Sequence, residues 1–227
     1  MDLTIIFLFI IASMFGTAVM IWAVRKSGQK REDYAAYAAA QGWDYSKTEG
    51  DGTHRLVDAF CEPGDDWALR IIFVSGGAQG HATQRYVEWT TQAGALPAGE
   101  AVLGMPIPEK TARMLQSGGA MGQTVARAAL KGTLYALGNT RFDLPFDTAT
   151  AGHPGGVVMA SPGNEASMDA LRDSADLAAF RAARREADVP VIIRDTEGLR
   201  LRRPGAPRTL EELSALVALG KSLRAAL

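Results

Sequence analysis

The sequence has little cysteine, little histidine and almost no net charge, and each shortage excludes a class of protein. Cys61 is the only cysteine among 227 residues, which excludes an intrachain disulfide and a cysteine-rich zinc site. The three histidines stand in no metal-binding spacing, so we expect no metal and no cofactor. The 24 basic and 25 acidic residues leave a formal charge of -1. A nucleic-acid-binding protein needs a basic surface to neutralise phosphates, so no nucleic-acid partner is expected.

Charge is also missing from one long stretch at the start of the chain. No charged residue occurs from Leu3 to Val24, and the segment is rich in Leu, Ile, Phe and Val. A helix of that length spans roughly 33 Å, which matches a hydrocarbon core about 30 Å thick. Trp22 lies near one end, where an indole suits the headgroup boundary. The sequence therefore predicts a transmembrane anchor, with the lipid bilayer as a partner through residues 3–24.

The residues that flank this segment predict its orientation. No basic residue precedes it, whereas four follow it: Arg25, Lys26, Lys30 and Arg31. The positive-inside rule then places the C-terminal part in the cytoplasm of a single-pass membrane protein, an arrangement common in bacterial inner membranes. A cleaved signal peptide is the competing interpretation, but it requires a positive n-region and a shorter apolar core.

The remainder of the chain has the pattern of an α+β fold with a mostly antiparallel sheet and flanking helices. A helix is expected over 31–41 and ends at Gly42. Strands are then expected over the following ranges: 43–47, 53–62, 67–74, 84–91 and 101–107. Short turns between them predict an antiparallel meander. The nearly two-sided hydrophobicity of 67–74 indicates a strand buried on both faces.

The C-terminal part predicts further elements. A strand is expected at 157–160, a helix from an Asn164 cap to about residue 187, and a hairpin over 190–203. The sequence Thr209-Leu210-Glu211-Glu212 has the form of a capping box, with Thr209 at the N-cap of a last helix.

These patterns suggest three parts. Residues 1–30 form the anchor and its basic flank. Residues 31–148 hold the first helix, the meander and glycine-broken helices, and residues 149–227 form a smaller strand–helix–hairpin–helix lobe with a hinge over 149–156. Whether the two lobes share one core is open at this stage.

Evidence for catalysis is weak, and we assign no catalytic residue. Residues 117–124 resemble a phosphate-binding loop, but Gln123 occupies the position of the essential lysine. The glycine-rich loop 75–83 around His81 is the nearest candidate for an enzyme site. The acidic pairs Asp65-Asp66 and Asp195-x-Glu197 are interpreted as solvated turn residues.

Arginine outnumbers lysine, and several arginines cluster in the C-terminal part. Such residues can form solvated faces, or they can form a patch that faces anions on a domain already tethered to an anionic leaflet. The candidate patch consists of Arg181, Arg184, Arg185, Arg200 and Arg202.

The leading hypothesis is therefore a membrane-tethered, non-catalytic domain that binds a protein partner or anionic lipid headgroups. Self-association through Ala12-xxx-Gly16 in the anchor is an additional expectation. The alternative is a membrane-tethered enzyme of unknown class, with its site near the glycine loop around His81.

Overall fold

The computed structural model describes residues 28–49, 55–74, 84–105, 153–185 and 188–227, together with positions 15, 19, 22, 25, 112, 113 and 124. The chain divides into two compact units, Met1–Tyr45 and Ser46–Leu227. Several predictions lie outside the described residues. These are most of the Leu3–Val24 span, the loop 75–83, the glycine-broken helices of 109–138 and the lobe boundary at 148/149.

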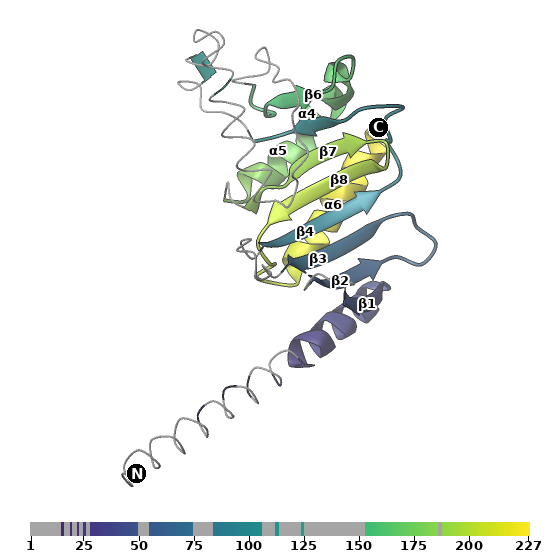
Figure 1. The fold of residues 1–227 in the computed structure, drawn as a ribbon, viewed down its shortest axis with the longest axis vertical. Helices are drawn as coiled ribbons and strands as arrows, with labels where there is room; N and C mark the ends of the chain where they lie inside the picture. Colours follow the sequence, from purple (N-terminus) through teal and green to yellow (C-terminus); the bar gives the residue numbers. More distant parts are fainter. Residues whose placement is uncertain are drawn as a thin grey trace, which may run out of the picture. The chain divides into compact units, whose positions relative to one another are not determined.

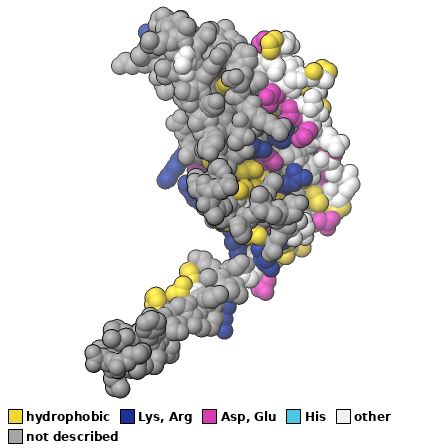
Figure 2. Space-filling model, viewed as in Figure 1, with side chains coloured by type: hydrophobic (Ala, Val, Ile, Leu, Met, Phe, Trp, Pro, Cys, Tyr) yellow, Lys and Arg dark blue, Asp and Glu magenta, His cyan; other side chains and the backbone are white. Residues whose placement is uncertain are grey.

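In the first unit, residues 28–41 are helical, which confirms the helix predicted over 31–41. Gly42, with a φ of 73°, follows the helix, because a residue without Cβ adopts this left-handed conformation readily. Phe15, Val19 and Trp22 are also helical, and their side chains are 72%, 48% and 62% exposed. Figure 2 shows hydrophobic side chains on the surface of this segment. Within the described positions, no helix is both long and apolar enough to cross a membrane.

The described residues form one sheet of eight strands, and the α+β class is confirmed (Figure 1). The spatial order of the strands is β1-β2-β3-β4-β8-β7-β5-β6. The first five strands along the chain are β1 (Asp44–Glu49), β2 (Arg55–Cys61), β3 (Ala68–Val74), β4 (Gln84–Thr91) and β5 (Ala101–Leu103). The last three are β6 (Val158–Ala160), β7 (Val191–Asp195) and β8 (Gly198–Pro204).

The predicted meander is correct from β2 to β4 and wrong for the fifth strand. β2, β3 and β4 pair in sequence as antiparallel neighbours. β5 does not pair with β4, because the β7–β8 hairpin lies between them, with β8 next to β4 and β7 next to β5. The hairpin is therefore part of the main sheet, and strands from 31–148 and 149–227 share it. Only non-local pairing fixes this order, and local sequence patterns do not encode such pairing.

Helices cover one face of the sheet (Figure 1). The long helix α6 (Glu211–Ala225) contacts β4 and β8, and α5 (Ala175–Ala182) contacts α6. The register places Leu69, Trp89 and Leu201 side by side beneath α6, and all three are fully buried. Gly220 of α6 lies directly on the Trp89 ring, so close that a Cβ there would be 2.4 Å from the ring carbon Cδ2. The core therefore requires glycine at this helix position.

The opposite face is buried as well along the middle of the sheet. Ile72, Tyr86 and Ile193 alternate with the residues beneath α6, and each is at least nine-tenths buried. In β3, Leu69 and Ile72 point to different faces and both are fully buried. The prediction that β3 is buried on both faces is correct at Ile72, but Ala68 on the same face is only half-buried and Arg70 is exposed.

Two helix predictions need correction. The single helix predicted from Asn164 to about residue 187 is divided into η2 (Glu165–Met168), α4 (Asp169–Arg172) and α5. Asn164 makes no side-chain cap, whereas Ser174 caps α5 by accepting a hydrogen bond from the backbone N of Leu177. A serine in extended conformation at that position ends one helix and begins the next.

The capping box before α6 is also absent. The helix begins at Glu211 with Leu210 at the N-cap, and there is no side-chain cap. Glu212 instead accepts from the backbone N of Arg208 at 3.0 Å and from the Arg203 guanidinium at 2.9 Å. The ion pair with β8 and the bond to the preceding loop take the place of the predicted cap.

Candidate polar groove on the sheet

A groove of about 630 Å³ lies on the sheet face opposite α6, across β3, β4 and β8. Ala68, Thr90 and Arg200 occupy paired positions on these strands and share one face. The groove is lined by these three residues and by Asp66, Arg70, Glu88, Thr91, Gln92, Ala95, Thr196 and Glu197. Its volume falls in the range of ordinary ligand sites, about 300–1,000 Å³. Figure 2 shows basic and acidic side chains close together on this side of the molecule.

At one end of the groove, three charged side chains form a row across the strands. The register pairs Arg70 of β3 with Glu88 of β4, and Glu88 with Arg202 of β8. Glu88 and Arg202 are only 5% and 7% exposed, and Arg202 Nε donates to Glu88 Oε2 at 2.6 Å. The Arg202 guanidinium also lies 5.0 Å from the centre of the Tyr86 ring. The carboxylate of Glu88 is therefore already neutralised by a buried partner.

At the other end of the groove, Arg200 of β8 is bound by acidic residues at the β7–β8 turn. Its guanidinium forms an ion pair with Asp195 and a second one, at 3.4 Å, with Glu197. Burial lowers the pKa of Arg200 from its ordinary value, because desolvation disfavours the charged form. The acidic residues of this turn, interpreted from the sequence as solvated, are thus partners of a partly buried arginine.

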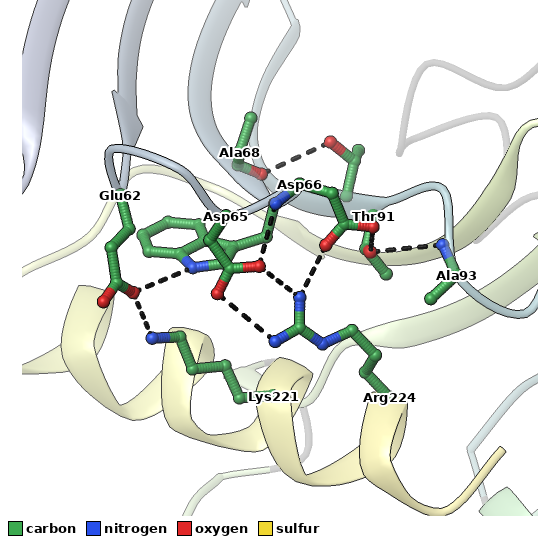
Figure 3. Close-up of polar contacts among 10 residues, drawn as sticks. Glu62, Asp65, Asp66, Ala68, Thr91, Ala93, Lys221 and Arg224 are labelled. Carbon is green, nitrogen blue, oxygen red and sulfur yellow. Dashed lines mark hydrogen bonds and ion pairs between the residues drawn. The ribbon is translucent and has the colours of Figure 1, made fainter.

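Asp66 forms one wall of the groove. It belongs to a polar network between the β2–β3 turn and α6 (Figure 3). Arg224 of α6 donates to Asp65 and to Asp66, at 2.5 Å in each case. The second oxygen of Asp66 accepts a 2.6 Å hydrogen bond from the Thr91 hydroxyl. The hydrogen bond from Arg224 lowers the pKa of Asp65 to about 2. Asp65 and Asp66 lie in a turn, as the sequence predicts, and Asp66 is exposed, but both carboxylates are also paired with Arg224.

The same network continues along α6 (Figure 3). Glu62 accepts a hydrogen bond from Trp67 Nε1 at 3.2 Å and forms an ion pair with Lys221. The hydrogen bond from Lys221 is the main reason that the pKa of Glu62 is lowered. Two consecutive turns of α6 are thus fixed to the turn that forms one wall of the groove.

Arg70 differs from the carboxylates that line the groove. Each lining carboxylate, Asp66, Glu88 and Glu197, is held by an arginine of the protein. Arg70 is exposed, and its side chain makes no ion pair or hydrogen bond in the part of the chain that the structure describes. Arg70 therefore presents an exposed guanidinium to the groove, and its planar donors match a carboxylate or phosphate.

The predicted arginine patch is not brought together. Arg200 and Arg202 lie on the groove face of β8, where both are held by carboxylates. Arg181 donates instead to the backbone oxygens of Gly155 and Gly104, at 2.6 and 3.1 Å. Its pKa is lowered to about 10 by burial. Arg181 therefore joins two loops through hydrogen bonds inside the domain.

The two other arginines of the patch follow α5. Arg184 lies 4.2 Å from the centre of the Phe180 ring, and Arg185 is exposed. Neither lines the groove. Of the five predicted residues, only Arg200 lines it directly, while Arg202 supports Glu88 from beside it.

Sequence reasoning missed Arg70, Glu88 and Thr90, although a signal was present. β3 and β4 are predicted as neighbouring antiparallel strands, and same-face residues of such a pair lie opposite each other. Once the turn between these two strands is placed, Arg70 of the first strand can be aligned with the polar residues of the second, Gln84–Thr91. The contribution of β8 could not be found in this way, because its pairing with β4 is non-local.

One site hypothesis from the sequence, the glycine loop around His81, is not part of this geometry. The loop around His81 lies outside the described residues. Across the described ranges, no group of three or more His, Cys, Asp or Glu side chains is arranged to hold a metal ion.

Comparison of the chain with protein-family models, curated proteins and solved structures gives no match.

Proposed function

We propose that this chain is a membrane-tethered, non-catalytic protein whose sheet domain binds a protein partner through the polar groove. The observation that carries the proposal is Arg70, an exposed guanidinium that makes no ion pair with any residue the structure describes, in a groove lined by polar and charged side chains. A charge left in this way at the mouth of a groove suits recognition of an external group.

The tether is part of the same proposal. The uncharged run from Leu3 to Val24 has the length and composition of a membrane span, and the basic residues that follow it favour a cytoplasmic location for the sheet domain. Exposed Phe15, Val19 and Trp22 are consistent with contact to lipid.

Binding to a protein is favoured over binding to lipid headgroups by the placement of the arginines. Headgroup binding needs several solvated cations on one surface. Arg181, Arg200 and Arg202 are engaged inside the domain by backbone oxygens or carboxylates, so they are not solvated cations.

Site-specific photo-crosslinking in cells tests the proposal. A photoreactive amino acid at Gln92, an exposed lining residue, is expected to give a discrete adduct in the full-length protein. The same amino acid at Arg185, which is exposed but outside the groove, is the matched control. The proposal requires an adduct at Gln92 that is absent at Arg185 and is lost with Arg70→Gln. Equal adducts at both positions, or an adduct that Arg70→Gln leaves unchanged, would contradict it.

A further inference from the structure

We infer that the partner bound by the groove is a second copy of this chain, in a two-fold dimer in which Arg70 of each copy pairs with Glu197 of the other. This inference rests on the proposed function, because it names the protein that occupies the proposed groove. Both residues line the groove, so the second copy contributes a charged group to the site of the first.

Two lining side chains of opposite charge are the most available to a partner. Arg70 is exposed and makes no ion pair with any residue that the structure describes. Glu197 is 77% exposed, and it lies 3.4 Å from Arg200, a guanidinium that also pairs with the carboxylate of Asp195. Glu88, in contrast, is buried against a guanidinium of β8. The groove therefore offers a partner one cation and one anion.

The other charges of the groove nearly cancel. Counted with the ion-pair partners of the lining residues, five carboxylates stand against four guanidiniums. The carboxylates are those of Asp65, Asp66, Glu88, Asp195 and Glu197, and the guanidiniums are those of Arg70, Arg200, Arg202 and Arg224. Such a balance favours neither a strongly acidic nor a strongly basic partner. A second copy has the same balance and can place each exposed charge against its opposite.

Arg70 and Glu197 lie at diagonally opposite ends of the groove. Ala68 of β3, Thr90 of β4 and Arg200 of β8 form one row across the strands. β3 and β8 run in the same direction, because each is antiparallel to β4. Arg70 follows Ala68 by two residues, whereas Glu197 precedes Arg200 by three, so Thr90 lies near the point halfway between the two charges.

This placement fits a two-fold axis. An axis that lies in the interface near Thr90, across the line from Arg70 to Glu197, exchanges the two charged positions. Arg70 of each copy then faces Glu197 of the other, and both ion pairs form together, as the symmetry of an isologous interface requires. Thr90 meets its own copy near the axis without like-charge repulsion, because its hydroxyl can both donate and accept a hydrogen bond.

The proposed tether makes such a dimer feasible. Exposed ion pairs are individually weak, so two of them give little association between freely diffusing chains. Anchors formed by Leu3–Val24 would confine both copies to one membrane and raise their effective concentration. The two ion pairs would then select which surfaces meet.

Charge exchange between two tagged copies tests the inference. Two full-length copies with different epitope tags are expressed in the same cells, and one of them carries the photoreactive amino acid at Gln92, an exposed lining residue. An adduct that carries both tags is a dimer of this chain.

The wild-type copies are expected to give this doubly tagged adduct. Arg70→Glu in both copies, or Glu197→Arg in both, places two like-charged pairs in the interface and should reduce the adduct about tenfold. Arg70→Glu in one copy and Glu197→Arg in the other recreates both opposite-charge pairs, so the adduct should return to the wild-type level. Arg185→Glu in both copies, which changes an exposed charge outside the groove, should leave the adduct unchanged.

The outcomes separate the inference from the proposed function. A discrete adduct with another protein, and none with both tags, would overturn the dimer while the groove remained a protein-binding site. A doubly tagged adduct that the single variants leave unchanged, or that the mixed variants fail to restore, would overturn the pairing of Arg70 with Glu197. Absence of any adduct at Gln92 would contradict both the inference and the proposed function.

Discussion

The ion pairs of Arg224 should make the sheet domain sensitive to acid, and Arg224→Ala tests this. Arg224 joins the end of α6 to the turn that carries Asp65 and Asp66 (Figure 3). The side chains of Arg224 and Asp65 are 27% and 25% exposed. The substitution removes both ion pairs and leaves the helix core untouched, because Arg224 lies on the helix surface while Leu223 is the buried neighbour.

The expected magnitude follows from the pKa of Asp65. Its lowering from 3.8 to about 2 in the folded state corresponds to at most ~2.4 kcal/mol in the free energy of unfolding. Because both partners are partly exposed, solvent screening reduces this to about 1 kcal/mol. The folded-state pKa is the lower one, so this stability is complete above pH ~5 and is lost as the pH falls toward 2. About half of it should be gone at pH 3.

Urea unfolding of the full-length protein in micelles, followed by tryptophan fluorescence at pH 7 and pH 3, measures the effect. Arg224→Ala is expected to lower the free energy of unfolding by about 1 kcal/mol at pH 7 and by about half as much at pH 3. Arg208→Ala is the control, because its 59% exposed side chain lies 3.5 Å from Asp188 and should contribute little. Equal losses for the two variants, or a loss that does not depend on pH, would refute the reasoning.

Three further predictions concern the core, the buried ion pair and topology. Gly220→Ala should lower the free energy of unfolding by about 1–2 kcal/mol in the same assay, because the clash with the fully buried Trp89 ring outweighs the better helix propensity of alanine; increased stability would show that the ring can move aside. Arg202→Ala should cost about 3–5 kcal/mol by leaving Glu88 buried and unpaired, and the double variant with Glu88→Leu should recover a large part of the loss; equal instability of single and double variants would contradict this. A fluorescent reporter fused after Leu227 should fluoresce in the cytoplasm while an export-dependent phosphatase fusion stays inactive; the reverse pattern would revive the signal-peptide interpretation.

Local patterns predicted most of the individual elements. The strand expected over 84–91 matches β4, and the strand expected over 67–74 matches β3 to within one residue. The apolar stripe of the last helix gives α6. These segments have strong periodicity and clear turn residues at their ends, so local chemistry is sufficient to define them.

The order of the strands could not be predicted in the same way. The insertion of β7 and β8 between β4 and β5 depends on contacts about 100 residues apart, such as Arg194 Nε donating to the Gly94 oxygen at 2.9 Å. Gly198 lies so close to the Thr91 oxygen that a Cβ would be 1.9 Å away, which shows how tightly the hairpin fits beside β4. The sequence of the hairpin alone carries no information about which strand it will join.

The sequence could not predict the surroundings of the candidate arginines for the same reason. Alternation correctly separated Arg200 and Arg202 from Leu199 and Leu201, but it could not supply their partners. The carboxylates that hold them come from β4 and from the adjacent turn. Arg200 and Arg202 are thus held inside the domain, whereas Arg70, the single charge in the apolar strand β3, is exposed.

The central claim is that a protein partner binds the polar groove. Its most direct test measures whether residues of the groove are shielded from solvent in native membranes. Single cysteines at Gln92 or Thr196, both exposed lining positions, are introduced into the full-length protein with Cys61 replaced by Ser. Their rates of reaction with a maleimide are compared between native membranes and purified protein, with Arg185→Cys as the control. The account predicts that the two groove cysteines react more slowly in membranes, that Arg70→Gln restores their rates, and that the control reacts equally in both. Groove cysteines that react equally fast in membranes and in purified protein would contradict it.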